Sequence, residues 1–161
     1  MQTYVYDRAT APSVKSRLVE ALGARYISPD PSHAEELAAL RGTVEVIYEA
    51  VGAPKVTAEM LRLLAANGIC VLTGVPGTLE PFLVEGGPRV RDLVLKNQVV
   101  LGVVNAGKEA YTAAIRDLGD FAERWPKELR SLIAHRYPVD HYREPLLGRP
   151  EGIKNVLTFA R

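Results

Sequence analysis

Two charged residues, Asp7 and Arg8, follow the short segment 3–6 (Thr-Tyr-Val-Tyr) and have side chains that could bind a ligand. The segment is β-branched and aromatic, which is typical of a strand, so we expect the pair at a strand end. At such a position an aspartate can accept hydrogen bonds from ribose hydroxyls and repel a 2′-phosphate. An arginine can pair with a phosphate or stack on adenine. The alternative is a solvated strand end, because both residue types are common in loops.

Glycine residues follow two further predicted strands, in segments 50–52 (Ala-Val-Gly) and 73–77 (Thr-Gly-Val-Pro-Gly). In open α/β sheets, ligands bind beyond the carboxyl ends of the strands, and glycine lets a ring or a ribose approach the backbone. The alternative is ordinary turn formation, since Val-Pro-Gly suits a tight turn. Glycines at two successive strand ends favour the binding role about as strongly as the turn.

Asn105 follows the apolar segment 99–104 and would lie at the carboxyl end of a third strand. Its carboxamide both donates and accepts hydrogen bonds, so it can hold a sugar hydroxyl or a nicotinamide amide. It can also cap the helix that we expect from Lys108, and one side chain could fill both roles.

The remaining chemically active residue types form no recognisable site. His33, His135 and His141 are scattered, and Cys70 lies within an apolar segment typical of a core strand. The chain has no Gly-x-Ser-x-Gly, no P-loop lysine motif and no cysteine–histidine pair with an orienting acid. We therefore predict no catalytic residue and no metal ligand in this chain.

Composition limits the classes of partner. The chain has 161 residues, 47% of them hydrophobic, which suffices for one domain with a real core. The 20 basic and 19 acidic residues nearly balance, so we expect neither nucleic acid nor an anionic membrane as a partner. The apolar runs are far shorter than the ~18 residues that span a bilayer. The start has no secretory pattern, and we expect a cytoplasmic protein.

Strand and helix patterns alternate through most of the chain, which predicts a parallel sheet flanked by helices. After Trp125 the pattern changes to two short helices and a final strand with no obvious partner. The predicted strands are residues 3–6, 25–28, 44–48, 69–73, 99–104 and 153–159, and we expect 69–73 and 99–104 to be buried on both faces. The predicted helices start at residues 13, 34, 54, 88, 108, 126 and 139, with Ser32 and Glu35 forming a capping box for the second.

Five segments together resemble the glucose 1-dehydrogenases of the zinc-dependent medium-chain dehydrogenase/reductase superfamily. They are residues 46–52, 67–77, 94–107, 133–139 and 153–157. The resemblance covers essentially the whole chain, which corresponds to roughly the second half of such an enzyme. It implies an α/β, Rossmann-like fold, a mostly parallel sheet with helices on both faces, lacking the first strand and its Gly-x-Gly-x-x-Gly turn. Residues 1–124 would form a partial NAD(P)-binding domain, and residues 125–161 would return to the catalytic domain.

The resemblance also implies roles for particular residues. Asp7 and Arg8 match the segment that contacts the adenosine ribose, where the family often has Asn-Arg-Arg or Gly-Arg-Arg. The carboxylate of Asp7 therefore favours NAD, although NADP stays open. The cofactor-binding residues predicted from the strand ends and the resemblance together are Asp7, Arg8, Ala50, Gly52, Leu72, Thr73, Gly74, Val75 and Asn105, and Asn105 would also face the sugar.

The resemblance places the zinc ligands and the proton relay upstream of Met1, so we expect zinc, and a sugar substrate, only in a full-length enzyme. The resemblance implies a glucose dehydrogenase, an oxidoreductase, and we expect the isolated chain to be inactive. The strand order 3-2-1-4-5-6 puts the missing strand at the centre of the sheet, which leaves two unpaired edges. The chain could pair residues 3–6 with 44–48, recruit a partner's strand, or be a fragment. The rival hypothesis is a non-catalytic Rossmann remnant that forms homo-oligomers or binds nucleotide weakly.

Overall fold

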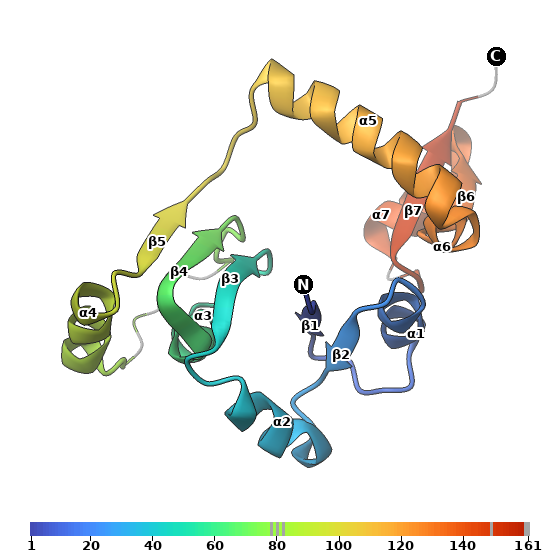
Figure 1. Ribbon diagram of the computed structural model, residues 1–161. Helices are drawn as coiled ribbons and strands as arrows, with labels where there is room; N and C mark the ends of the chain where they lie inside the picture. The colour runs from blue at the N-terminus through green and yellow to red at the C-terminus, as the bar shows by residue number, and fades with distance from the viewer. Residues whose placement is uncertain (78, 80, 82, 149, 160–161) are drawn as a thin grey trace. The chain divides into compact units, whose positions relative to one another are not determined.

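The computed structural model describes residues 1–77, 79, 81, 83–148 and 150–159 (Figure 1). It contains two compact units. One is Ala34–Ala106, and the other combines Met1–His33 with Gly107–Arg161. The boundary after residue 124 expected from the resemblance concerns the division of a full-length enzyme, and it stays a prediction.

The unit Ala34–Ala106 is built on a three-stranded parallel sheet in the order β3-β4-β5. The strands are β3 (Val44–Glu49), β4 (Leu64–Leu72) and β5 (Val99–Gly102). The register aligns Ile47 of β3 with Cys70 of β4, and Cys70 with Val100 of β5. Because all three strands run in the same direction, their carboxyl ends lie at one edge of the sheet.

The helices α3 (Pro54–Met60) and α4 (Gly86–Leu95) connect these strands, as the alternating pattern predicts, and α2 (Ala34–Ala39) precedes β3. The helix predicted to start at Pro54 is shorter than its stop signal in the sequence, Asn67-Gly68, would allow. It ends at Met60 and passes through a 3₁₀ turn (Leu61–Leu63) into β4. Leu63 and Leu64 have the helical spacing of an apolar face, but they are buried in the core at the start of the strand.

The predicted burial of residues 69–73 and 99–104 on both faces is wrong for this unit. Cys70 is 1% exposed, whereas its neighbour Ile69 is 41% exposed, and all four residues of β5 are exposed. The helices of the unit leave one face of its sheet uncovered. The register places two cross-strand rows of apolar residues on that face: Val46, Ile69 and Val99 in one row, and Tyr48, Val71 and Leu101 in the other.

The second unit begins with the parallel pair β1 (Tyr4–Tyr6) and β2 (Arg25–Ile27), connected by α1 (Val14–Ala21). The sequence predicts that this helix starts at residue 13, and in the structure Ser13 is its capping residue. Its hydroxyl accepts from the Ser16 amide at 3.0 Å, and the Ser16 hydroxyl accepts from the Ser13 amide at 2.8 Å. Tyr26, Ile27 and Ser28 are buried, and β2 packs against α1.

The rest of this unit consists of α5 (Lys108–Arg124), α6 (Pro126–Ser131), β6 (Ile133–Pro138), α7 (Arg143–Leu147) and β7 (Lys154–Thr158). The expectation that the final strand has no partner is wrong, because β7 pairs in parallel with β6. The strand β6 lies between two short helices, and the polar residues His135 and Arg136 interrupt its apolar sequence. That weak pattern is why the sequence did not predict it.

Two further expectations about helix starts are corrected. Asn105 does not cap α5, since the capping residue is Gly107 and no side chain bonds the first turn. The predicted capping box of Ser32 and Glu35 does not appear among the hydrogen bonds of the described residues. A 3₁₀ turn (Pro31–His33) precedes α2, and the carboxylate of Asp30 accepts from the Ser32 amide at 2.9 Å.

Each sheet of the described residues has open edges. β1 pairs with β2, β3 pairs with β4, and β6 pairs with β7. The suggested pairing of residues 3–6 with 44–48 would join strands of the two units, and it stays a prediction. Open edges leave backbone N–H and C=O groups without strand partners, which is a site for further strand pairing.

Candidate functional site

The predicted residues at the carboxyl ends of β3 and β4 come together in one unit. Ala50 and Gly52 follow β3, Leu72 is the last residue of β4, and Thr73 follows it directly. The Thr73 amide donates to the Glu49 carbonyl at 2.8 Å, and the Gly74 amide donates to the same oxygen at 3.1 Å. The two strand-end loops are therefore hydrogen-bonded to each other.

Gly52 and Gly74 allow these loops to approach backbone to backbone. A Cβ atom on Gly74 would lie 2.0 Å from the Gly52 nitrogen and 2.6 Å from the Val51 nitrogen. A Cβ atom on Gly52 would lie 2.4 Å from the Val75 carbonyl oxygen, and Gly52 has a φ of +71° that disfavours other residues. Both glycines are thus required by the contact between the loops. This contact is a structural reason for both glycines, and their binding role stays a proposal.

Glu49, which the sequence analysis did not select, joins the two loops. Its Oε1 atom accepts from the Val51 amide at 2.8 Å and from the Gly52 amide at 2.7 Å. Its carbonyl also accepts from the Thr73 hydroxyl at 3.0 Å, besides the two amides of the next loop. A charged residue that ends an apolar strand just before a glycine is the signal that could have identified it.

Asn105 lies three residues beyond β5 and is exposed. The ladder continues past the end of β5, since the Val103 amide donates to the Leu72 carbonyl at 2.9 Å. Asn105 therefore follows a strand end at the same edge of the sheet as Gly52 and Gly74. None of the hydrogen bonds of the described residues involves its carboxamide, which leaves the group available to a ligand.

Asp7 and Arg8 lie in the other unit, at the carboxyl end of β1. The Asp7 carboxylate accepts from the Ala9 amide at 2.9 Å and forms an ion pair with Lys15 of α1 at 2.8 Å. Burial alone raises the pKa of Asp7, but the hydrogen bonds from Lys15 and Ala9 and the charges of Lys15 and Arg8 outweigh it. The net effect is a pKa below the ordinary value of 3.8. Arg8 is exposed.

Tyr26 makes a hydrogen bond to the loop that contains Asp7 and Arg8. Its hydroxyl donates to the Ala9 carbonyl, and its ring is buried. Burial raises the pKa of Tyr26, and the negative charge of Asp7 raises it further. The neutral phenol is therefore favoured, and it fixes the loop that follows Asp7.

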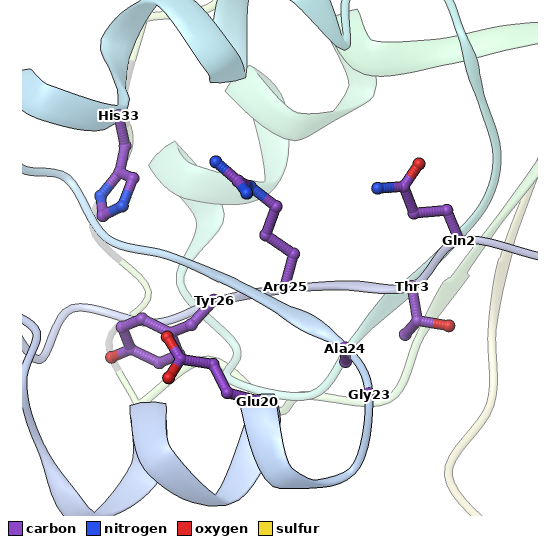
Figure 2. A pocket seen from close by; sticks show the side chains of 8 residues that line it. All are labelled: Gln2, Thr3, Glu20, Gly23, Ala24, Arg25, Tyr26 and His33. Carbon is purple, nitrogen blue, oxygen red and sulfur yellow. The ribbon is translucent and has the colours of Figure 1, made fainter.

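A cavity of about 400 Å³ lies at the opposite end of the same strand pair (Figure 2). Gln2 and Thr3 precede β1, and Gly23 and Ala24 precede β2, so the cavity opens at the amino ends of the strands. Figure 2 shows the side chains of the consecutive residues Arg25 and Tyr26 on opposite sides of β2. Ligands of open α/β sheets bind at the carboxyl ends, and we therefore place the candidate site there and not in this cavity.

His33, His141 and Cys70 contact or lie among other residues of the chain. The Nδ1 atom of His33 lies 3.1 Å from the hydroxyl of the buried Ser28, and that of His141 lies 2.7 Å from Glu144. Cys70 is buried in the core, as predicted, and burial followed by the charge of Glu49 raises the pKa of its thiol. Among the described residues, no group of three or more His, Cys, Asp or Glu side chains could hold a metal. None of the helices in that part of the chain is long and apolar enough to span a membrane.

Comparison with known families gives one match that covers almost the whole chain. Residues 1–159 match the family described as "Glucose dehydrogenase C-terminus". The chain spans less than half the length of the curated relatives that it resembles. Two of them are glucose 1-dehydrogenase 2 of Haloterrigena turkmenica (31% identity over 99% of this chain and 44% of the relative) and glucose 1-dehydrogenase of Thermoproteus tenax (38% identity, 92% and 42%).

Solved structures show the same fold. The chain is similar to Haloferax mediterranei glucose dehydrogenase in complex with NADP, Zn and gluconolactone, with a TM-score of 0.82 and 24% identity over 99% of this chain and 44% of that one. It is also similar to benzyl alcohol dehydrogenase from Acinetobacter calcoaceticus, with a TM-score of 0.74, 18% identity and coverage of 99% and 43%. The predicted α/β, Rossmann-like class is confirmed, and the chain covers only part of these folds.

Because the two loops approach closely, the effect of a glycine-to-alanine substitution on stability should depend strongly on which glycine is replaced. Gly74→Ala should lower the free energy of unfolding by about 2–3 kcal/mol, because its Cβ atom would overlap backbone atoms that cannot move independently. Gly77→Ala is the matched control in the same loop, where a Cβ atom would meet nothing within 4 Å, and its effect should stay below about 0.5 kcal/mol. Urea unfolding followed by circular dichroism measures both. Equal midpoints for the two variants would refute the contact between the loops.

The Asp7–Lys15 pair predicts a pH-dependent contribution to stability. Because folding lowers the pKa of Asp7, its stabilising effect should be complete above the ordinary value of 3.8 and should disappear as the pH falls through the lower folded value. Asp7→Asn should therefore destabilise the chain at pH 7 and differ little from wild type near pH 2. Thermal unfolding between pH 2 and 7 measures this difference. In a Lys15→Ala background the effect of Asp7→Asn should shrink, and an unchanged effect would contradict the pairing.

Proposed function

The chain belongs to the glucose dehydrogenase C-terminus family, and we propose that it is the cofactor-binding portion of an NAD(P)-dependent glucose, or related aldose, 1-dehydrogenase. The observation that carries the proposal is the family match over residues 1–159, together with the strand-end loops of the same chain. The substrate and the reaction of the whole enzyme are part of the proposal, because the chain spans under half of its relatives.

The ends of β3 and β4 fit the nicotinamide end of the cofactor. The amides of residues 51, 52, 73 and 74 are already bonded to Glu49, so this edge has few free donors for an anionic phosphate. The Thr73 hydroxyl donates to Glu49 and keeps its lone pairs, so it can accept from a carboxamide N–H. Asn105 can accept and donate beside it. We assign Ala50, Gly52, Leu72, Thr73, Gly74, Val75 and Asn105 to this end of the cofactor.

Asp7 and Arg8 fit the adenosine end. Each oxygen of the Asp7 carboxylate has one partner, Ala9 or Lys15, and retains capacity to accept a ribose hydroxyl. The exposed Arg8 is free to stack on adenine or to meet a phosphate. Lys15 tempers the repulsion that Asp7 exerts on a 2′-phosphate, so we propose a preference for NAD that is moderate.

The nicotinamide ring would accept a hydride, and the substrate would be an aldose that is oxidised at C1. Asn105 would hold a sugar hydroxyl beside the ring, and the two glycine loops would keep the ring surface close to the backbone. The described residues contain no cluster of side chains that could hold zinc. The remaining portion of the enzyme would supply both the zinc ligands and the proton relay.

The first expectation is that the purified 161-residue chain does not oxidise glucose. Absorbance at the reduced-nicotinamide band, with NAD or NADP and added zinc, measures turnover directly. The same assay on one of the longer relatives is the positive control. Glucose-dependent NAD(P)H formation by this chain alone would show that it contains its own catalytic groups.

The second expectation concerns cofactor choice. Wild type should bind NAD more tightly than NADP, at roughly millimolar affinity or about −4 kcal/mol, because the Gly-rich pyrophosphate turn is absent from this sequence. Asp7→Asn should narrow the difference by weakening the repulsion of a 2′-phosphate. A calorimetric titration of both cofactors measures this, with Lys15→Ala as the variant that should widen the difference. Tighter NADP binding by wild type would show that Arg8 dominates over Asp7.

The alternative function is a non-catalytic module that forms oligomers. The open edges of the three sheets and the uncovered apolar face of β3-β4-β5 favour it specifically. Light scattering over a range of concentrations separates the two functions. A monomer at all concentrations, combined with dinucleotide binding, would reject the module. Oligomers that bind neither cofactor would support it.

A further inference from the structure

Glu49 makes more hydrogen bonds at the strand ends than any cofactor residue assigned above. Its carboxylate accepts two amides of its own loop, and its carbonyl accepts two amides and a hydroxyl of the next loop. In the described part of the chain, no hydrogen bond or ion pair involves its Oε2 atom. That atom lies beside Gly74, at 2.7 Å from the position of a Cβ atom on this glycine.

The carboxylate therefore adds an uncompensated negative charge at the point where the two loops meet. The nearby amides soften the charge through Oε1, but no lysine or arginine neutralises it among the described residues. A phosphate at this position would be repelled, and a cationic group would be attracted. Oxidised nicotinamide has a positively charged ring, whereas reduced nicotinamide has a neutral one.

We propose that Glu49 positions the two glycine loops and, through its charge, makes this site prefer the oxidised, cationic nicotinamide over the reduced, neutral one. The inference rests on the proposed function, since it needs the nicotinamide end of a dinucleotide at these loops. It adds a residue and a redox-state preference to that site. Glu49 is a positioning residue, because it acts through the loops and through its field.

The expected size of the preference follows from Coulomb's law. A unit charge within about 8 Å of a carboxylate, in a partly solvated site, changes affinity on the order of three- to tenfold. Removing the charge should therefore change the ratio of the NADH and NAD⁺ dissociation constants by that factor. A purely structural contact would change both constants together and leave their ratio as in wild type.

Glu49→Gln is the informative variant, because the glutamine carbonyl can still accept the Val51 and Gly52 amides while the charge is lost. Glu49→Ala removes both the acceptor and the charge. Glu45→Gln is the matched control, since Glu45 is an exposed carboxylate on the same strand, roughly 13 Å away at about 3.3 Å per residue. Circular dichroism and urea unfolding establish that each variant is folded.

The experiment titrates NAD⁺, NADH and ADP-ribose separately into wild type and the three variants, by calorimetry. ADP-ribose has the adenosine, pyrophosphate and ribose groups but lacks the nicotinamide ring. We expect Glu49→Gln to weaken NAD⁺ three- to tenfold relative to NADH and to leave ADP-ribose within about twofold. Glu49→Ala should weaken both dinucleotides, and Glu45→Gln should weaken none of the three.

Two other outcomes reject the inference alone, and a third rejects the proposed function as well. An unchanged NADH-to-NAD⁺ ratio in a folded Glu49→Gln variant, with wild type binding both, overturns this inference and leaves the proposed function intact. A parallel loss of ADP-ribose overturns it too, because the charge would then act away from the ring. If wild type binds none of the three ligands, the proposed function fails and the inference fails with it.

Discussion

One residue at the end of one strand determines how the candidate site is built. Glu49 accepts five hydrogen bonds, from its own loop through the side chain and from the next loop through the carbonyl. These bonds bring Gly52 and Gly74 to a distance at which no side chain fits between them. The geometry of the strand ends thus depends on an acceptor that bonds amides of both loops, and glycine is what makes the approach possible.

The parallel register of the sheet allows such a bridge. Glu49 pairs with Leu72, so the two strands end level with each other and their loops leave the sheet side by side. The uncovered apolar face on β3-β4-β5, in contrast, contributes little to the stability of the unit. A three-stranded sheet with one bare face buries little apolar area, and most of its order must come from the ladders and from the small core around Leu64 and Cys70.

The features that could be predicted from the sequence are those that depend on residues close together in the chain. The helix start at Ser13, the strand ends and the alternating elements depend on neighbours a few residues apart, and the structure agrees with them. The partner of the final strand, the early end of α3 and the exposure of β5 depend on distant packing, which periodicity does not report. Glu49 was missed for a similar reason, because its role arises only when two loops meet.

The burial of Cys70 has a consequence for how this chain opens. It is the only cysteine, the residue is 1% exposed, and burial together with the charge of Glu49 disfavours the reactive thiolate. Alkylating and oxidising reagents can therefore reach sulfur only when β4 separates from its neighbours. The rate at which the native chain is labelled thus reports local opening of the central strand beneath the candidate site, separately from the fraying of its loops.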